Sequence, residues 1–194
     1  STSWRFVGDR VTLSRSVAVA GEGATGGEIV FLGPHEAYER TAAGQRFRLV
    51  VPAAVDTEPP HEEVLDSLAD ASASFDVRDR DSEVFVVAAP EAVEWGSAGL
   101  QYGPNDAWVR ADAPIDTADN AWLHEYVHTR QNFTTTEETR WLVEATAEYY
   151  AALLALGQGR IGFDEFRDHL ARGTRRPYAD AVLTRPGTWA AETD

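Results

Sequence analysis

Residues 121–150 read AWLHEYVHTRQNFTTTEETRWLVEATAEYY, and most of the expected fold follows from this stretch. It contains His124-Glu125-Tyr126-Val127-His128, an HExxH pattern. On an α-helix, residues i and i+4 lie about 40° apart around the axis and about 6 Å along it, so both imidazoles can reach one metal ion. Glu125 then lies beside them, where its carboxylate can act on a water that the metal activates.

A catalytic zinc ion usually takes three protein ligands, and the next helical segment offers the third. A short break at residues 134–136 makes the two helices antiparallel neighbours, in which facing residues have a constant sum of residue numbers. If Glu144 faces His128, then Glu148 faces His124. We therefore predict Zn²⁺ bound by His124, His128 and Glu144, with Glu148 accepting a hydrogen bond from the free ring N–H of His124. The alternative for Glu148, a solvated helix carboxylate, stays open.

The rest of the chain predicts an α+β fold, with a strand-rich N-terminal part followed by a helical part. We divide it into a strand-rich region at residues 1–55 and a catalytic domain at residues 56–194. Apolar runs predict strands at 10–20, 28–32, 45–51, 83–89 and 106–111, with glycine-rich turns at 21–27 and 96–103. Periodicity predicts helices at 59–75, from a cap at Asp116 or Thr117 to about 131, from a Thr135–Glu138 capping box to about 157, and at 163–172.

Charge and composition limit the classes of partner. The 194 residues include 17 basic ones, all of them Arg, against 32 acidic ones, a formal net charge of −15. Such a surface repels phosphate, so nucleic acid is not an expected partner. The carboxylate excess without Lys favours adaptation to high salt, with an ordinary acidic protein as the alternative. No cysteine is present for a thiolate site, and no apolar run approaches the roughly 20 residues of a membrane span.

The chain contains no Met and opens at Ser1, so we expect a processed form or an excised piece. No signal segment remains to be read, and the sequence does not determine the compartment. We favour an extracellular or cell-surface location in high salt over the cytoplasm.

HExxH followed by Trp141-Leu142-x-Glu144-x-x-Ala147-x-Tyr149 resembles the gluzincin metallopeptidases, of the peptidase-MA-like and glycyl-aminopeptidase-like types. Those proteins typically carry Trp-Leu-x-Glu-Gly, where this chain has Ala145 in place of the Gly. The resemblance covers about residues 108–194. It implies a thermolysin-like zincin core with the HExxH helix packed against the glutamate helix, Zn²⁺ as cofactor, and a peptide or protein as substrate. It also implies a strand whose free edge pairs with substrate, and we expect residues 106–111 to be that strand.

Two features depart from the family pattern. Gly99-Leu100-Gln101-Tyr102-Gly103 does not match the Gly-Ala-Met-Glu-Asn signature of classical aminopeptidases, so the choice between endo- and exopeptidase stays open. Relatives place an oxyanion-stabilising Tyr beyond the zinc helices. Tyr178 is the only Tyr there, but Leu183–Trp189 resembles the segment that precedes this motif. We therefore leave Tyr178 unassigned and expect the donor beyond Asp194.

Zinc-dependent peptide hydrolysis, with Glu125 as general base, is the function that these patterns predict. Two alternatives stay open: a non-catalytic domain that zinc stabilises, and a peptidase-like binding domain with a vestigial site. The remaining histidines are expected outside the site, with His35 and His61 on the surface near prolines and His169 solvated on a charged helix.

Overall fold

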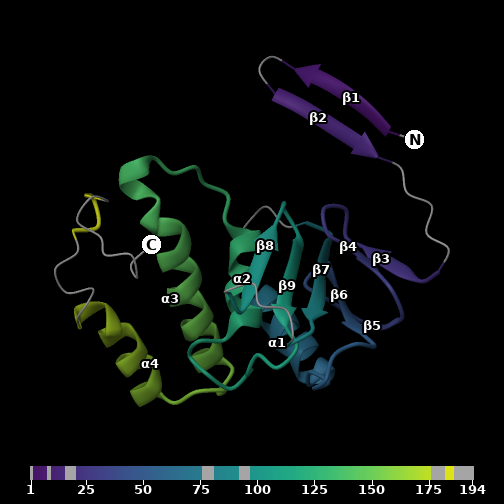
Figure 1. Cartoon of the computed structure of the whole chain (residues 1–194). Helices are drawn as coiled ribbons and strands as arrows, with labels where there is room; N and C mark the ends of the chain where they lie inside the picture. The colour runs from purple at the N-terminus through teal and green to yellow at the C-terminus, as the bar shows by residue number, and fades with distance from the viewer. Residues whose placement is uncertain are drawn as a thin grey trace.

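The computed structural model describes residues 2–7, 10–15, 21–75, 81–91, 97–175 and 182–185. Its elements confirm an α+β fold with a strand-rich N-terminal part followed by helices, although one helix, α1 (His61–Ser74), comes before the last three strands (Figure 1). The strands are β1 (Thr2–Val7), β2 (Arg10–Arg15), β3 (Gly23–Thr25), β4 (Val30–Leu32), β5 (His35–Ala42), β6 (Gln45–Pro52), β7 (Glu83–Ala89), β8 (Gly99–Tyr102) and β9 (Asp106–Arg110). The helices are α1 (His61–Ser74), α2 (Ala121–Arg130), α3 (Trp141–Gly157) and α4 (Phe163–Leu170), with short 3₁₀ turns η1 (Glu137–Thr139) and η2 (Ala171–Thr174).

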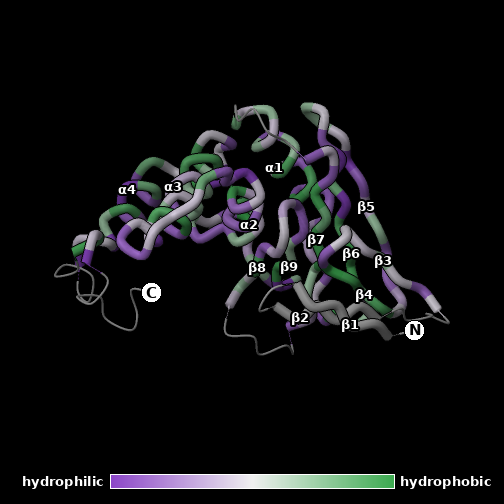
Figure 2. Tube along the Cα trace, turned by 90° about the horizontal axis from the view of Figure 1, so that it is seen from above, coloured by the Kyte–Doolittle hydropathy of each residue, from purple (hydrophilic) through white to green (hydrophobic). Residues whose placement is uncertain are grey.

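Five strands form the main sheet in the order β5-β6-β7-β9-β8. The three inner strands are parallel, and β5 and β8 pair antiparallel at the two edges. Figure 2 shows hydrophobic residues along β6 and β7, as expected for parallel strands covered on both faces. β6 and β7 come from opposite sides of residue 55. The two predicted regions therefore contribute to one sheet, and the division between them stays a prediction.

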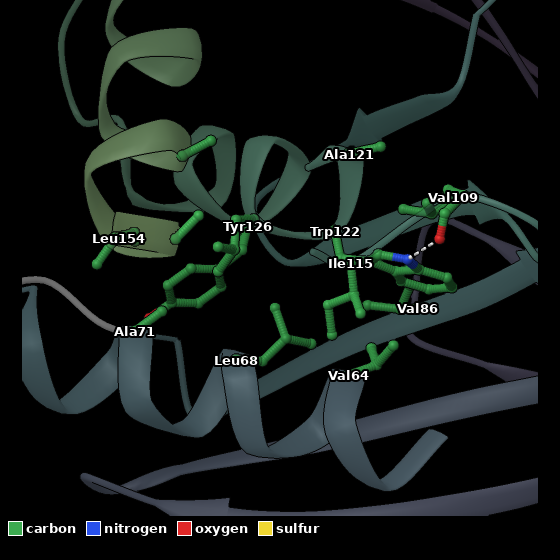
Figure 3. Packing of buried hydrophobic residues seen from close by; sticks show 14 of the residues in the cluster. Val64, Leu68, Ala71, Val86, Val109, Ile115, Ala121, Trp122, Tyr126 and Leu154 are labelled. Carbon is green, nitrogen blue, oxygen red and sulfur yellow. Dashed lines mark hydrogen bonds between the residues drawn. The ribbon is translucent and has the colours of Figure 1, made fainter. Parts of the chain in front are cut away.

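The main core lies between the sheet and the helices α1 and α2 (Figure 3). Alternate residues of β6, such as Phe47 and Leu49, point to this side, and α1 contributes Leu68 at helical spacing from its other buried residues. Trp122 and Tyr126 of α2 enter the same cluster, and the indole N–H of Trp122 donates to the carbonyl of Ala113 at 3.1 Å. This apolar face of α2 turns its histidines toward α3.

A buried polar network fixes the position of α2 further. The hydroxyl groups of Tyr126 on α2 and Ser72 on α1 both donate to Gln45 Oε1, at 3.0 and 2.8 Å. The amide of Gln45 donates in turn to the carbonyl of Asp81 at 2.8 Å. Because leaving any one of these buried groups unpaired would cost about 1–3 kcal/mol, the network holds two helices and a strand in one register.

The β3–β4 hairpin packs on the opposite face of the sheet. The buried carboxylate of Asp106 on β9 accepts the backbone N–H groups of Glu28 at 2.8 Å and Ile29 at 2.6 Å, just before β4. Gly26 lies so close to this carboxylate that a side chain there has no room. The buried carboxylate of Asp106 thus attaches the hairpin to β9, the strand that pairs with the edge strand β8.

Several predicted boundaries differ from the structure. The predicted helix cap at Asp116 or Thr117 is wrong, because Asn120 caps α2 by accepting the N–H of Leu123 at 3.0 Å. The predicted Thr135–Glu138 capping box is also wrong, since Thr136 and Thr139 form the box at η1, and α3 begins at Trp141.

Strands β1, β5 and β8 were not expected, and β3 lies inside a predicted turn. The predicted strand at 10–20 is confirmed through residue 15, and residues 16–20 lie outside the described residues. The last predicted helix ends at Leu170 and continues as a 3₁₀ turn. Within the ranges described, no helix has the length and apolar character that crossing a membrane requires.

Candidate metal centre

The three predicted ligands meet where α2 packs against α3. The Nε2 atoms of His124 and His128 lie 3.0 Å apart. Glu144 Oε2 lies 3.3 Å from the first and 3.5 Å from the second. The HExxH spacing and the antiparallel pairing of the helices thus bring together the residues that the sequence singled out, as a group that could hold a metal ion.

The spacing of these donor atoms fits a tetrahedral ion. Ligand bonds of about 2.0–2.2 Å at tetrahedral angles separate ligand atoms by about 3.3–3.6 Å. The three observed separations, 3.0, 3.3 and 3.5 Å, are close to this range. The side chain of Glu144 is 68% exposed, so the site faces solvent on that side. Two imidazoles and one carboxylate suit zinc and other first-row divalent ions.

The ring nitrogens turned away from this centre are both held by acceptors. His124 Nδ1 lies 3.1 Å from Glu148 Oε2, as predicted from the antiparallel pairing of the two helices. His128 Nδ1 lies 3.0 Å from Gln131 Oε1. A hydrogen bond at Nδ1 leaves the Nε2 lone pair free for a metal and fixes the orientation of each ring.

Gln131 is a site residue that the sequence reasoning missed. Its amide group donates to the carbonyl of Val143 at 2.6 Å and to the hydroxyl of Thr146 at 2.9 Å. Gln131 therefore both orients His128 and joins the end of α2 to α3. The sequence offered one signal for this role: Gln131 lies three residues after His128, and residues three apart lie on the same side of a helix.

Small residues let the two helices approach. Ala147 and Ala151 of α3 are buried, and both belong to the core cluster shared with α2. They lie one helical turn apart, on the side of α3 predicted to face α2. This close packing brings the carboxylates of α3 within hydrogen-bond reach of the imidazoles of α2.

The charges at the centre perturb one another strongly. Hydrogen bonds from His124 and then from His128 hold the pKa of Glu144 well below its usual range. Hydrogen bonds from His124 and His169 lower the pKa of Glu148 to about 2. Burial disfavours the charged ring of His124, but its hydrogen bonds to Glu144 and Glu148 outweigh burial and raise its pKa to about 9. A metal ion that binds His124 at neutral pH must therefore displace a proton from its ring.

Glu125 follows His124 on α2 and packs against the edge strand β8. Its side chain is buried, and burial raises the pKa of its carboxyl above the ordinary value. The backbone N–H of Gln101 on β8 donates to this carboxylate. Gly99 on the same strand leaves the space that the Glu125 side chain fills, because a Cβ there would lie 2.8 Å from Glu125 Oε1. β8 therefore holds the predicted general base in place.

The expectation that residues 106–111 present a free edge is wrong. β9 lies between β7 and β8, and both of its edges are paired. The edge strand is β8, which the sequence reasoning had placed in a glycine-rich turn. Its apolar residues Leu100 and Tyr102 are exposed, and only four residues were available to show strand periodicity.

The expectation that His169 is solvated is also wrong. Its side chain is buried. The Nε2 atom lies 3.2 Å from Glu148 Oε1, and the Nδ1 atom lies 3.4 Å from Asp119 Oδ1. His35 and His61 are half-buried and belong to neither cluster of candidate ligands among the described residues. Tyr178 lies outside the described residues.

A scan against protein-family models finds no match, and a search of curated proteins finds no similar sequence.

Proposed function

We propose that this protein is a zinc-dependent peptidase of gluzincin type, with a thermolysin-like zincin core. The observation that carries the proposal is the convergence of His124 Nε2, His128 Nε2 and Glu144 Oε2 within 3.0–3.5 Å, beside a buried Glu125. The antiparallel edge strand β8, next to the HExxH helix, is consistent with the core that the family resemblance implies.

Zinc held by these three residues would act as a Lewis acid, polarising the scissile carbonyl and making water a better nucleophile at neutral pH. Glu125 accepts the proton of the attacking water and delivers it to the departing amine. Its raised pKa suits the first step, because a carboxylate with a higher pKa accepts a proton more readily. The N–H of Gln101 keeps the carboxylate oriented between these transfers.

An open site favours catalysis over a purely structural role. Structural zinc sites are usually closed by four protein ligands. Among the residues that the structure describes, three side chains converge here, and the next carboxylate, that of Glu148, is hydrogen-bonded to Nδ1 of His124 instead. The exposed side of Glu144 leaves access for a substrate carbonyl.

The edge strand supplies a route for substrate recognition. Among the described residues, β8 has a sheet neighbour on one side only. An extended peptide that pairs with β8 would pass beside Glu125, which contacts this strand at Gly99 and Gln101. We propose unstructured peptide segments as the substrate class.

Glu125→Gln tests the general base. The substitution keeps the side-chain shape, so zinc content should stay near one ion per chain while kcat falls at least about 100-fold. Zinc is measured by elemental analysis, and turnover with a quenched-fluorescence peptide library in high salt. Glu138→Gln, on the exposed turn η1, is the matched control and should retain full activity.

The same assays separate the alternatives. Zinc binding without turnover by the wild-type protein would support a non-catalytic zinc-stabilised domain. Failure to bind zinc would support a vestigial site in a binding domain. A Glu125→Gln protein that cleaves peptides at the wild-type rate would overturn the mechanism.

A further inference from the structure

His169 lies directly behind the candidate metal centre, although it belongs to neither of the metal helices. Its side chain is 4% exposed, and its Nε2 atom donates to Glu148 Oε1 at 3.2 Å. The other oxygen of the same carboxylate lies 3.1 Å from His124 Nδ1. One carboxylate of α3 therefore joins a histidine of α4 to a proposed metal ligand of α2.

Side chains on one face of α4 and the turn η2 form hydrogen bonds with the residues just before the N-terminus of α2. Glu165, His169 and Arg172 recur at spacings of four and three residues, which places them on one side of the helix. Glu165 Oε1 accepts the backbone N–H of Ala118 at 3.0 Å. The guanidinium of Arg172 donates to Asp119 Oδ1 at 2.6 Å, and His169 Nδ1 lies 3.4 Å from the same oxygen. These contacts lie just before the helix that carries the HExxH motif.

Polar contacts matter here because α4 has little apolar anchorage of its own. The helix has eight residues, and Phe166 and His169 are its buried ones. Short helices in water depend on tertiary contacts for their stability. Loss of the bond from His169 would therefore loosen α4 and release Glu148 at the same time.

The cluster of His169, Glu148 and Asp119 could also be considered as a second cation site, since its donor atoms lie within 4.8 Å of one another. The guanidinium of Arg172 argues against this role. It already supplies a positive charge at 2.6 Å from Asp119, and a divalent ion there would be repelled. The arrangement favours a chain of hydrogen bonds over a second ion.

We propose that His169 is a positioning residue for the metal centre. Its ring N–H fixes the carboxylate of Glu148, and Glu148 fixes the ring of His124, so docking of α4 and binding of the metal are coupled. This inference rests on the proposed function, since it assigns a role toward the same ion. Both oxygens of Glu148 are engaged, so its carboxylate cannot rotate without giving up one of the two histidines.

Three variants of the full chain test this role. His169→Leu removes the donor and should weaken zinc binding about tenfold, the low end of the range for partners that orient a ligand. His169→Gln retains an N–H donor and should stay within about threefold of wild type. Phe166→Leu loosens α4 but keeps the ring N–H of His169, so its zinc affinity should fall less than that of His169→Leu. Zinc affinity is measured by competition with a chromophoric chelator.

Hydrogen exchange provides a second readout that does not depend on catalysis. If α4 docking strengthens zinc binding, zinc must strengthen α4 docking by the same factor. Added zinc should therefore slow amide exchange in α4 of the wild-type protein, and this protection should be lost in His169→Leu while α2 remains protected.

Wild-type zinc affinity in His169→Leu, or no effect of zinc on α4 exchange, would overturn the positioning role while leaving the proposed function intact. An equal loss of affinity in Phe166→Leu and His169→Leu would show that packing alone is responsible. Two zinc ions per wild-type chain, falling to one in His169→Leu, would identify a second ion site instead. A wild-type protein that binds no zinc would overturn both proposals.

Discussion

Gly99→Ala provides the sharpest test of how the sheet edge positions the general base. A Cβ at residue 99 would lie 2.8 Å from both Cγ and Oε1 of Glu125, whereas ordinary contacts begin at 3.4 Å. The carboxylate must therefore move by about 0.6 Å, the difference between these two distances. Since a displacement of about 1 Å can cost about 100-fold in rate, we expect kcat to fall about 10- to 100-fold.

The three atoms nearest to this Cβ all belong to Glu125 and none to the ligands His124, His128 and Glu144, so zinc affinity should be unchanged in Gly99→Ala. Peptide hydrolysis and chelator competition are measured side by side. Gly157→Ala is the matched control, because a Cβ at the end of α3 meets no other atom within 4 Å. Wild-type kcat in Gly99→Ala would refute the reasoning, as would a parallel loss of zinc and activity.

Three further predictions concern the metal and the charge of the chain. Glu148→Ala should weaken zinc binding about 10- to 100-fold, and unchanged affinity in the chelator assay would exclude its role in orienting His124. In the metal-free protein the pKa of His124 is raised to about 9, so its ion pairs stabilise the fold fully below about pH 6.5 and are lost as the pH rises through 9. Zinc binding between pH 7 and 8 should therefore release protons, and for each proton released the affinity should rise about tenfold over this one pH unit. Calorimetry in buffers of different ionisation enthalpy measures the protons released, and a pH-independent affinity would contradict the prediction. The net charge of −15 predicts a melting temperature that rises steeply with molar KCl, and an indifferent one would contradict adaptation to high salt.

The centre could be predicted from the sequence because its geometry is mostly local. Helical spacing alone brings His124 and His128 to one side of α2, and a short connection makes α3 antiparallel to it. The constant sum of facing residues then placed Glu144 and Glu148 opposite the two histidines, as the structure shows.

Contacts between distant segments could not be predicted in the same way. The strand β8 has four residues and lies in a stretch with glycines at 96, 99 and 103, so this sequence is typical of a turn. Its place at the sheet edge depends on pairing with β9. The buried side of α4 could not be predicted either. Phe163, Phe166 and Leu170 recur at helical spacing, but only Phe166 of the three is buried, so this pattern did not indicate that the ring of His169 faces Glu148.

The sequence by itself determined which residues could converge on a metal ion, because the pitch of one helix and the reversal into the next leave few alternatives. Only the tertiary structure decided what supports them: an edge strand against Glu125, an amide from Gln131, and a buried histidine behind Glu148. These contacts join segments separated along the chain, and their positions depend on how the whole core packs rather than on any local spacing.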